Sequence, residues 1–159
     1  MNNTYLLLGS NMGNSQEQLQ TAIKMIEERI GTLIRQSSLY ATAAWGNTDQ
    51  PDFLNQVLIV ETRFSAVETL DKLLGIEKKM GRVRTIKNAP RIIDIDILFF
   101  NNEIINEKQL TVPHPEIQNR RFVLTPLNEL SPNLIHPVLQ QTVSVLLEHC
   151  PDELDVRKF

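Results

Sequence analysis

The chain is poor in cysteine, and Cys150 is its only thiol, so an internal disulfide is excluded. No cluster of cysteine and histidine has the spacing of a zinc site. No apolar run approaches the length needed to cross a bilayer, and the first residues lack the basic segment of a secretory signal. These absences favour a reducing, cytoplasmic setting and no membrane partner.

Positive charge is also scarce overall: the chain has 16 Lys and Arg residues and 19 Asp and Glu residues, so its formal net charge is −3. A broad nucleic-acid-binding surface is therefore not expected. The sequence shows no internal repeat and no low-complexity linker, and 159 residues suffice for one domain with a buried core. We expect one domain over residues 1–159, with a monomer as the simplest state.

Although the chain has a net negative charge, four cations lie close together between residues 81 and 91: Arg82, Arg84, Lys87 and Arg91. A run of β-branched and aromatic residues follows and ends at a turn-like Asn101-Asn102, which is typical of a buried strand. Alternation along that strand predicts one face with Ile93, Ile95, Ile97 and Phe99, and another with Asp94, Asp96, Leu98 and Phe100.

Two aspartates on one face would lie roughly 6–7 Å apart along the strand. Like charges beside a core are unfavourable unless a cation or hydrogen-bond donors compensate them. Mg²⁺ accepts such oxygen ligands together with substrate phosphates, and arginines bind phosphate oxygens in a bidentate manner. The pattern therefore suggests a Mg²⁺–nucleotide site. The competing interpretation is a solvated loop whose arginines pair with the aspartates.

The remaining pattern predicts an α+β ferredoxin-like βαββαβ core: an antiparallel sheet with helices on one face, and additional C-terminal helices. The aspartate-bearing strand would lie inside the sheet, with its carboxylates facing a cleft. Ser15 with Gln18, and Ser65 with Glu68, form possible capping boxes at two helix starts. The predicted elements are strands over 5–8, 32–42 and 53–64, helices over 15–30, 65–80, 120–130 and 138–150, and a peripheral tail after Pro151.

Three polar or aromatic residues have two interpretations each, and a fourth, His114, has an unusual sequence setting. Trp45 lies in a turn-rich loop and could recognise a ligand or pack beneath the loop. Asn55 shares a strand face with apolar residues, so its amide needs backbone or ligand partners. Glu77 is predicted on the inward face of the second helix, beside Val67, Leu70, Leu73 and Leu74, and could pair with an arginine or bind a ligand. His114, between two prolines, is predicted to be held in a loop.

Several segments resemble, in order, the 6-hydroxymethyl-7,8-dihydropterin pyrophosphokinase family, from the first strand to at least Pro126. They are KNAPRIIDIDIL at 87–98, LGSN at 8–11, DQPDFLN at 49–55, GRVR at 81–84, and LTVPH at 110–114 followed by NRRF at 119–122. The resemblance implies transfer of pyrophosphate from ATP, the co-substrate, to 6-hydroxymethyl-7,8-dihydropterin in folate biosynthesis, giving AMP and the pterin diphosphate.

The resemblance also implies roles for individual residues. Asp94 and Asp96 would hold two Mg²⁺ ions, and Arg82 and Arg91 would act catalytically on the phosphates. Phe53 and Phe122 would sandwich the pterin. The implied ATP-binding residues are Leu70, Leu74, Glu77, Arg84, Lys87, Ile97, Leu110, Thr111, His114 and Arg120. The implied pterin-binding residues are Thr42, Ala44, Trp45, Phe53, Asn55 and Phe122.

The chain departs from the commonest family pattern in the loop between Arg84 and Arg91, which is one residue shorter than in many relatives. Asn88-Ala89 stands where Trp-Gly is frequent, and Thr85 where lysine is often found. We predict that Lys87 supplies the cation missing at Thr85.

Two other functions share parts of the pattern. A two-metal nucleotidyltransferase on a ferredoxin-like core would release pyrophosphate rather than AMP. A non-catalytic ferredoxin-like binding module, for example for RNA, is disfavoured by the low basic charge and the absence of an aromatic RNA-binding strand.

Overall fold

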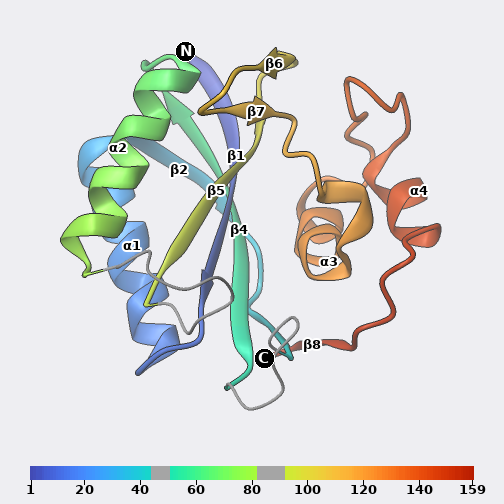
Figure 1. The fold of residues 1–159 in the computed structure, drawn as a ribbon, viewed down its shortest axis with the longest axis horizontal. Coiled ribbons are helices and arrows are strands. Elements are labelled where there is room, and N and C mark those ends of the chain that lie inside the picture. Colours follow the sequence, from blue (N-terminus) through green and yellow to red (C-terminus); the bar gives the residue numbers. More distant parts are fainter. Residues whose placement is uncertain (44–50, 82–91) are drawn as a thin grey trace.

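The computed structural model of the chain describes residues 1–43, 51–81 and 92–159 (Figure 1). Six strands form the main sheet and two form a small one, and four α-helices and one 3₁₀-helix accompany them in these residues. The main-sheet strands are β1 Asn2–Ser10, β2 Gly31–Gln36, β3 Tyr40–Thr42, β4 Phe53–Thr62, β5 Asp94–Phe100 and β8 Val156–Lys158. The others are β6 Ile105–Asn106, β7 Thr111–Val112, α1 Ser15–Arg29, α2 Ala66–Lys79, the 3₁₀-helix Ile117–Asn119, α3 Arg121–Leu130 and α4 Val143–Glu148.

The main sheet is antiparallel and has the strand order β5-β1-β4-β3-β8, with β2 also paired to β4. The ferredoxin-like βαββαβ order is confirmed, with the third element divided into β2 and β3. The division follows from Ser37, whose hydroxyl oxygen accepts a hydrogen bond from the Val57 N–H at 2.9 Å. A side chain thus takes the place of a ladder partner, and the predicted single strand over 32–42 is wrong.

Strand β5 lies at the edge of the described sheet, and not inside it as its apolar sequence predicts. Its outer side is covered by other parts of the chain. Glu77 of α2 accepts from the Ile95 N–H at 2.7 Å, and the His114 N–H donates to the Leu98 carbonyl at 3.0 Å. Because these groups cover the edge, β5 has the apolar composition of an inner strand.

The two helices of the ferredoxin-like core, α1 and α2, cover one face of the sheet as predicted, and the appended helices α3 and α4 cover the other (Figure 1). Leu6, Leu8 and Leu58 belong to the core beneath α1 and α2. Leu7 and Val57 belong to a second core with α3 and α4. The appended C-terminal helices therefore bury the sheet face that a bare ferredoxin-like core leaves open, and this second face carries the polar residues discussed below.

A β-bulge changes the predicted faces at the end of β5. Tyr5 pairs with Phe99 and Leu6 pairs with Ile97, so Leu98 is the extra residue. Leu98 and Phe99 consequently both pack in the core with α3, whereas Phe100 packs in the core with α1 and α2. The predicted faces are correct from Ile93 to Leu98 and wrong for both phenylalanines.

The two helix starts differ in how they are capped. In α2 the predicted capping box of Ser65 and Glu68 is present, with bonds of 3.0 and 3.2 Å. In α1 the cap is Asn14, whose side chain accepts from the Glu17 N–H at 3.1 Å, and not the predicted Ser15. Asparagine is at least as good an N-cap as serine, so the earlier residue takes the role.

The inward face of α2 is only partly as predicted. Leu73 and Glu77 are buried, at 1% and 2% exposure, and Leu70 packs partly against the core. Val67 and Leu74 are exposed, at 36% and 41%. Only one side of the helix packs against the sheet, so its buried stripe is narrower than the apolar pattern suggests.

The C-terminal part differs most from prediction. Helix α4 spans only Val143–Glu148 and is capped by Thr142, because residues before it form a turn in which Gln140 has a φ of +56°. The tail after Pro151 is not peripheral: β8 pairs with β3 in the main sheet. In the described ranges, none of the helices has the length and apolar character required of a membrane span.

Candidate functional site

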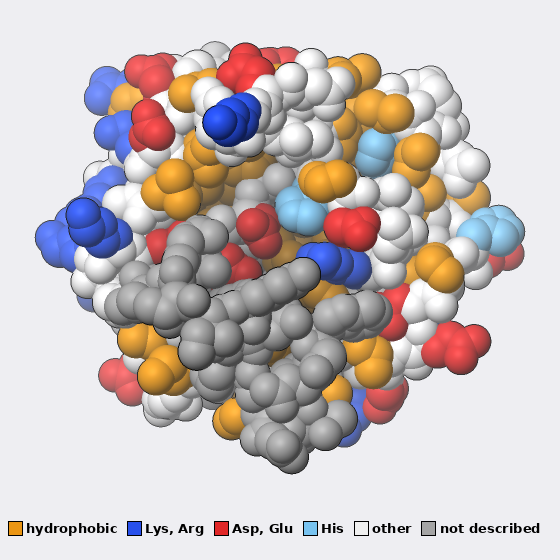
Figure 2. Space-filling model, viewed as in Figure 1, with side chains coloured by type: hydrophobic (Ala, Val, Ile, Leu, Met, Phe, Trp, Pro, Cys, Tyr) orange, Lys and Arg blue, Asp and Glu red, His pale blue; other side chains and the backbone are white. Residues whose placement is uncertain are grey.

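A cavity of about 270 Å³ lies between the sheet and the start of α3. In Figure 2, acidic, histidine and basic side chains lie beside one another near the middle of the hollowed face. The strands β1, β3, β4 and β5 supply the floor and α3 supplies one wall. The lining residues are Leu7, Gly9, Thr42, Ala43, Phe53, Asn55, Asp94, Asp96, Leu98, His114, Arg120, Phe122 and Val123.

The strand register explains how distant parts of the sequence meet here. Gly9 of β1 pairs with Asn55 of β4 on one side and with Asp94 of β5 on the other. Neighbouring strands are about 4.8 Å apart, so an amide and a carboxylate stand on either side of Gly9, separated by about 10 Å. The sheet thereby presents one polar row whose middle position has no side chain.

Gly9 is required by this row. A Cβ atom at Gly9 would lie 2.7 Å from the Asn55 side-chain oxygen, closer than Cβ atoms approach other heavy atoms in proteins. The Asn55 side chain is 4% exposed and leans across the space that any other residue at position 9 would fill. Sequence reasoning did not select Gly9 individually. A glycine inside a strand, next in register to a buried amide, is the feature that could have identified it.

Asp94 and Asp96 both line the cavity and are half-buried, on the face that the sequence predicted. Among residues 1–43, 51–81 and 92–159, no three or more His, Cys, Asp or Glu side chains form a group that could hold a metal. A divalent ion that takes only one or two protein carboxylates, and completes its shell with phosphate oxygens and water, still matches the pair.

His114 reaches the cavity from the loop after β7, as predicted. Its Nδ1 accepts a hydrogen bond from the Glu116 N–H at 3.1 Å, so the proton of the neutral imidazole is on Nε2. Burial lowers the pKa of His114 below its usual value, and the Arg120 charge lowers it further, whereas Glu116 and Asp94 oppose the shift. Near neutral pH the ring is therefore an uncharged N–H donor.

Two aromatic rings border the same cavity, Phe53 from β4 and Phe122 from α3. The Arg120 guanidinium lies 5.9 Å from the centre of the Phe122 ring, within cation–π range. Thr42 is 3% exposed, and its hydroxyl donates to the Asp155 carbonyl at 3.2 Å. The predicted pterin residues that the structure describes, Thr42, Phe53, Asn55 and Phe122, are thus all brought together.

Several predicted ATP-binding residues do not line this cavity; of these, Leu70, Ile97 and Leu110 pack in the core with α1 and α2. Leu110 and Ile97 are buried at 7% and 4%, whereas Leu74 and Thr111 are exposed. Glu77 accepts from the Ile95 N–H, a backbone partner that neither interpretation of its sequence position included. Because β5 is an edge strand, one elongated ligand crossing that edge can reach both the cavity and these residues.

Six of the predicted site residues lie outside the described residues. They are Ala44, Trp45, Arg82, Arg84, Lys87 and Arg91. Cavity residues that sequence reasoning missed are Leu7, Ala43, Leu98 and Val123, besides Gly9. Strand alternation could have identified Leu98, because it shares a strand face with Asp94 and Asp96.

The fold and the site together define an α+β ferredoxin-like domain with an acidic pair and an aromatic-lined cavity on one sheet face. The model of the family described as 7,8-dihydro-6-hydroxymethylpterin-pyrophosphokinase (HPPK) matches residues 5–132. The chain belongs to that family, and the resemblance found in its sequence is confirmed.

Individual relatives agree. The chain is 40% identical over 149 residues to a protein named 2-amino-4-hydroxy-6-hydroxymethyldihydropteridine pyrophosphokinase from Haemophilus influenzae, covering 91% of this chain and 93% of that protein. It is 41% identical over 141 residues to the protein of the same name from Aquifex aeolicus, covering 89% and 88%. It is 41% identical over 150 residues to the folic acid synthesis protein fol1 of Schizosaccharomyces pombe, covering 94% of this chain but 20% of that protein.

Solved structures show the same fold. A Plasmodium falciparum HPPK-DHPS triple mutant superposes with a TM-score of 0.77 at 21% identity, covering 92% of this chain and 43% of that one. The wild-type Plasmodium protein gives a TM-score of 0.76 at 22% identity, covering 93% and 43%. At this identity the likeness concerns the fold alone. The chain spans less than half of these proteins.

Proposed function

We propose that the chain transfers the pyrophosphoryl group of ATP to the hydroxymethyl oxygen of 6-hydroxymethyl-7,8-dihydropterin, releasing AMP, in folate biosynthesis. The observation that carries the proposal is one cavity that holds the acidic pair Asp94 and Asp96 together with Asn55, Phe53 and Phe122. A flat bicyclic ring with a polar edge is complementary to the two aromatic rings and the amide.

The size of the cavity supports a division of the site between the two substrates. About 270 Å³ is below the roughly 300–1,000 Å³ typical of sites for drug-sized ligands. It suits one bicyclic ring system and not a ring system plus a nucleotide. We propose that the pterin enters the cavity and that ATP crosses the edge of β5, with its phosphates beside Asp94 and Asp96.

The edge of β5 offers hydrogen-bonding groups for the adenine. The Ile95 N–H donates to Glu77 of α2, so it points away from β1. Along an antiparallel strand, the backbone groups of successive residues point alternately to the two sides. The N–H and C=O of Ile97 therefore also point outward. With Leu70 and Leu110 nearby as apolar cover, this edge can hold a purine ring.

The reaction forms a bond between the hydroxymethyl oxygen and the β-phosphorus, and it breaks the bond from that phosphorus to the oxygen retained by AMP. Asp94 and Asp96 would hold Mg²⁺, which we propose as two ions. Bound there, the metal withdraws charge from the phosphates and orients them. His114 presents its Nε2–H, and Arg120 its guanidinium, on the same side of the cavity. Preorganised donors of this kind stabilise charge that grows on phosphate oxygens.

The main sheet includes both β1, near residue 1, and β8, near residue 159, so residues 1–159 contribute to one sheet. We propose a single domain over residues 1–159 and, as the simplest state, a monomer. The single cysteine supports a cytoplasmic setting.

Product analysis tests the function. The protein is incubated with ATP, Mg²⁺ and the hydroxymethyl pterin, and nucleotides are separated by chromatography. AMP that forms only when the pterin and Mg²⁺ are both present supports the proposal. Release of pyrophosphate would instead indicate a nucleotidyltransferase. An Asp96→Ala protein that retained full biological activity would indicate a non-catalytic binding module.

A further inference from the structure

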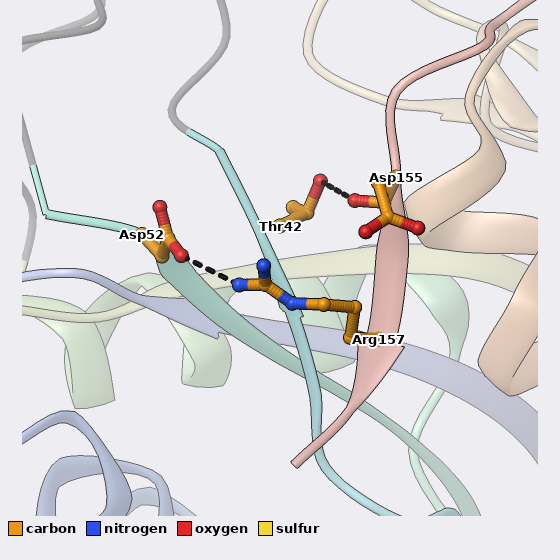
Figure 3. A network of polar contacts seen from close by, with 4 residues as sticks. All are labelled: Thr42, Asp52, Asp155 and Arg157. Carbon is orange, nitrogen blue, oxygen red and sulfur yellow. Dashed lines mark hydrogen bonds and ion pairs between the residues drawn. The ribbon is translucent and has the colours of Figure 1, made fainter.

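The last residues of the chain contact two walls of the cavity, although the family model ends at residue 132. Strand β8 pairs with β3, so that Thr42 lies opposite Val156. The Thr42 hydroxyl donates to the Asp155 carbonyl at 3.2 Å, as Figure 3 shows. In the same view Arg157 extends across to Asp52, with 2.9 Å between the charged atoms. Asp52 directly precedes Phe53. The C-terminal segment therefore contacts the sheet at Thr42 of β3 and again next to Phe53 of β4.

Asp152 connects the same segment to α3. Its carboxylate accepts from the Arg121 N–H at 3.0 Å and from the Leu154 N–H at 2.9 Å. Its backbone carbonyl accepts from the Arg121 side chain at 2.9 Å. Asp152 is 7% exposed, so these partly buried bonds compete little with water.

Asp152 replaces the missing cap of α3. The residue in the N-cap position, Arg120, makes no side-chain capping bond. A helix start leaves N–H groups without intrahelical partners and carries a partial positive charge, and an anion there satisfies both. Asp152 supplies that anion from 31 residues farther along the chain.

Arg121 is immediately followed by Phe122 and Val123, and preceded by Arg120, and all three of these neighbours line the cavity. The direction in which α3 begins therefore sets the position of the Phe122 ring relative to Phe53. The acidic pair and the groups at the edge of β5 lie on β5 and α2, and their described bonds do not involve the C-terminal segment.

We propose that Asp152 is a positioning residue for the pterin site, acting through the start of α3, and that the segment 152–158 holds α3 and β3 at the separation the pterin needs. This inference rests on the proposed function. Loss of Asp152 allows the Phe122 wall and the adjoining Arg120 to shift, while Asp94 and Asp96 stay in place on β5. The stacked ring depends on the position of α3 throughout, whereas ATP loses the fit of one contact, so the KM for the pterin rises more than the KM for ATP.

The test compares two helix caps. Asp152→Ala removes the cap of α3. Thr142→Ala removes the cap of α4, because the Thr142 hydroxyl accepts from the Val145 N–H at 3.2 Å. Asp152→Asn is a conservative variant that keeps one acceptor oxygen, and it remains testable if the alanine variant fails to fold. For each protein, AMP formation is measured against pterin at saturating ATP and against ATP at saturating pterin, and unfolding is followed by calorimetry.

We expect Asp152→Ala to raise the KM for the pterin about tenfold and the KM for ATP by no more than about threefold, and Asp152→Asn to fall between it and the wild type. Thr142→Ala lowers the unfolding temperature without changing either KM. Equal pterin KM values for the variants and the wild type overturn the inference, as does a parallel rise in both KM values. Wild-type protein that forms no AMP refutes the proposed function itself, which separates the two failures.

Discussion

Replacing Gly9 with alanine tests whether the Asn55 amide is the polar contact of the ring site. The added Cβ would lie 2.7 Å from the Asn55 oxygen, against about 3.4 Å for an ordinary contact, so the amide must move by about 0.7 Å. A side chain forced off its rotamer costs about 0.5–1.5 kcal/mol, and each misaligned hydrogen bond to the pterin costs a further 0.5–1.5 kcal/mol or so. For one hydrogen bond the sum is about 1–3 kcal/mol, an increase of about 5- to 150-fold in the KM for the pterin.

Gly75→Ala is the matched control, because a Cβ atom at Gly75 meets nothing within 4 Å. This glycine lies in α2, where alanine is the better helix former, so the control should gain about 0.5–1 kcal/mol of unfolding free energy and keep its kinetics. The assay is the rate of AMP formation as a function of pterin concentration at saturating ATP.

A double-mutant cycle sharpens the result. If Gly9→Ala acts through the amide, it has little further effect on pterin KM in an Asn55→Ala background. Additive effects of the two substitutions, or a wild-type pterin KM for Gly9→Ala alone, would refute the reasoning.

Three further perturbations address the metal, the edge of β5 and a buried histidine. Asp96→Asn should reduce the rate of AMP formation by about a hundredfold or more and raise the Mg²⁺ concentration needed, because it removes one charged ligand and keeps the shape; an unchanged rate would contradict the metal-holding role. Glu77→Ala leaves the buried Ile95 N–H without its acceptor, so the unfolding temperature measured by calorimetry should drop by about 2–10 °C, equivalent to about 1–3 kcal/mol, and an unchanged temperature would contradict the assigned bond. Burial lowers the pKa of His136, whose Nδ1 accepts from two backbone N–H groups, so the unfolded chain binds a proton more readily than the folded chain. The contribution of His136 to the free energy of unfolding is therefore present above about pH 6.5 and is lost as the pH falls toward the folded-state pKa. Denaturant titrations should therefore show the stability difference between wild type and His136→Gln shrinking from pH 7.5 to pH 5, and a constant difference would exclude this role.

Local patterns predicted the elements whose periodicity is strong. The Ser65 and Glu68 capping box and the alternation that puts Asp94 and Asp96 on one face are both present in the structure. Each depends only on residues a few positions apart, which is the range over which capping and strand alternation operate.

The errors arise where distant parts of the chain meet. An apolar strand at the edge of a sheet looks like an inner strand when a helix and a loop cover it, as they cover β5. The register shift at Leu98 is set by its pairing with β1, and a single sequence does not show which strand pairs with it. The polar-rich tail after Pro151 gave no periodicity, yet its backbone completes the sheet and Asp152 completes α3.

The sequence predicted which residues belong to the site, but not how they are arranged in space. Asn55 had two interpretations in the sequence because its partners depend on Gly9 of β1 and on the side of the sheet that α3 covers. The structure places Asn55 in the cavity with Phe53 and Phe122, and places Ile97 and Leu110 in the core with α1 and α2. This separation of the ring site from the nucleotide side is a tertiary feature, since β5 contributes to both.

The most direct test of the central claim follows the β-phosphoryl group of ATP. The proposed transfer of a pyrophosphoryl group with release of AMP requires attack at the β-phosphorus, beside Asp94 and Asp96 at the cavity that we assign to the pterin. With ATP labelled at that position, Mg²⁺ and the hydroxymethyl pterin, the label should appear in the pterin product, and the AMP should be unlabelled. Label recovered in ADP or in free pyrophosphate would contradict the account.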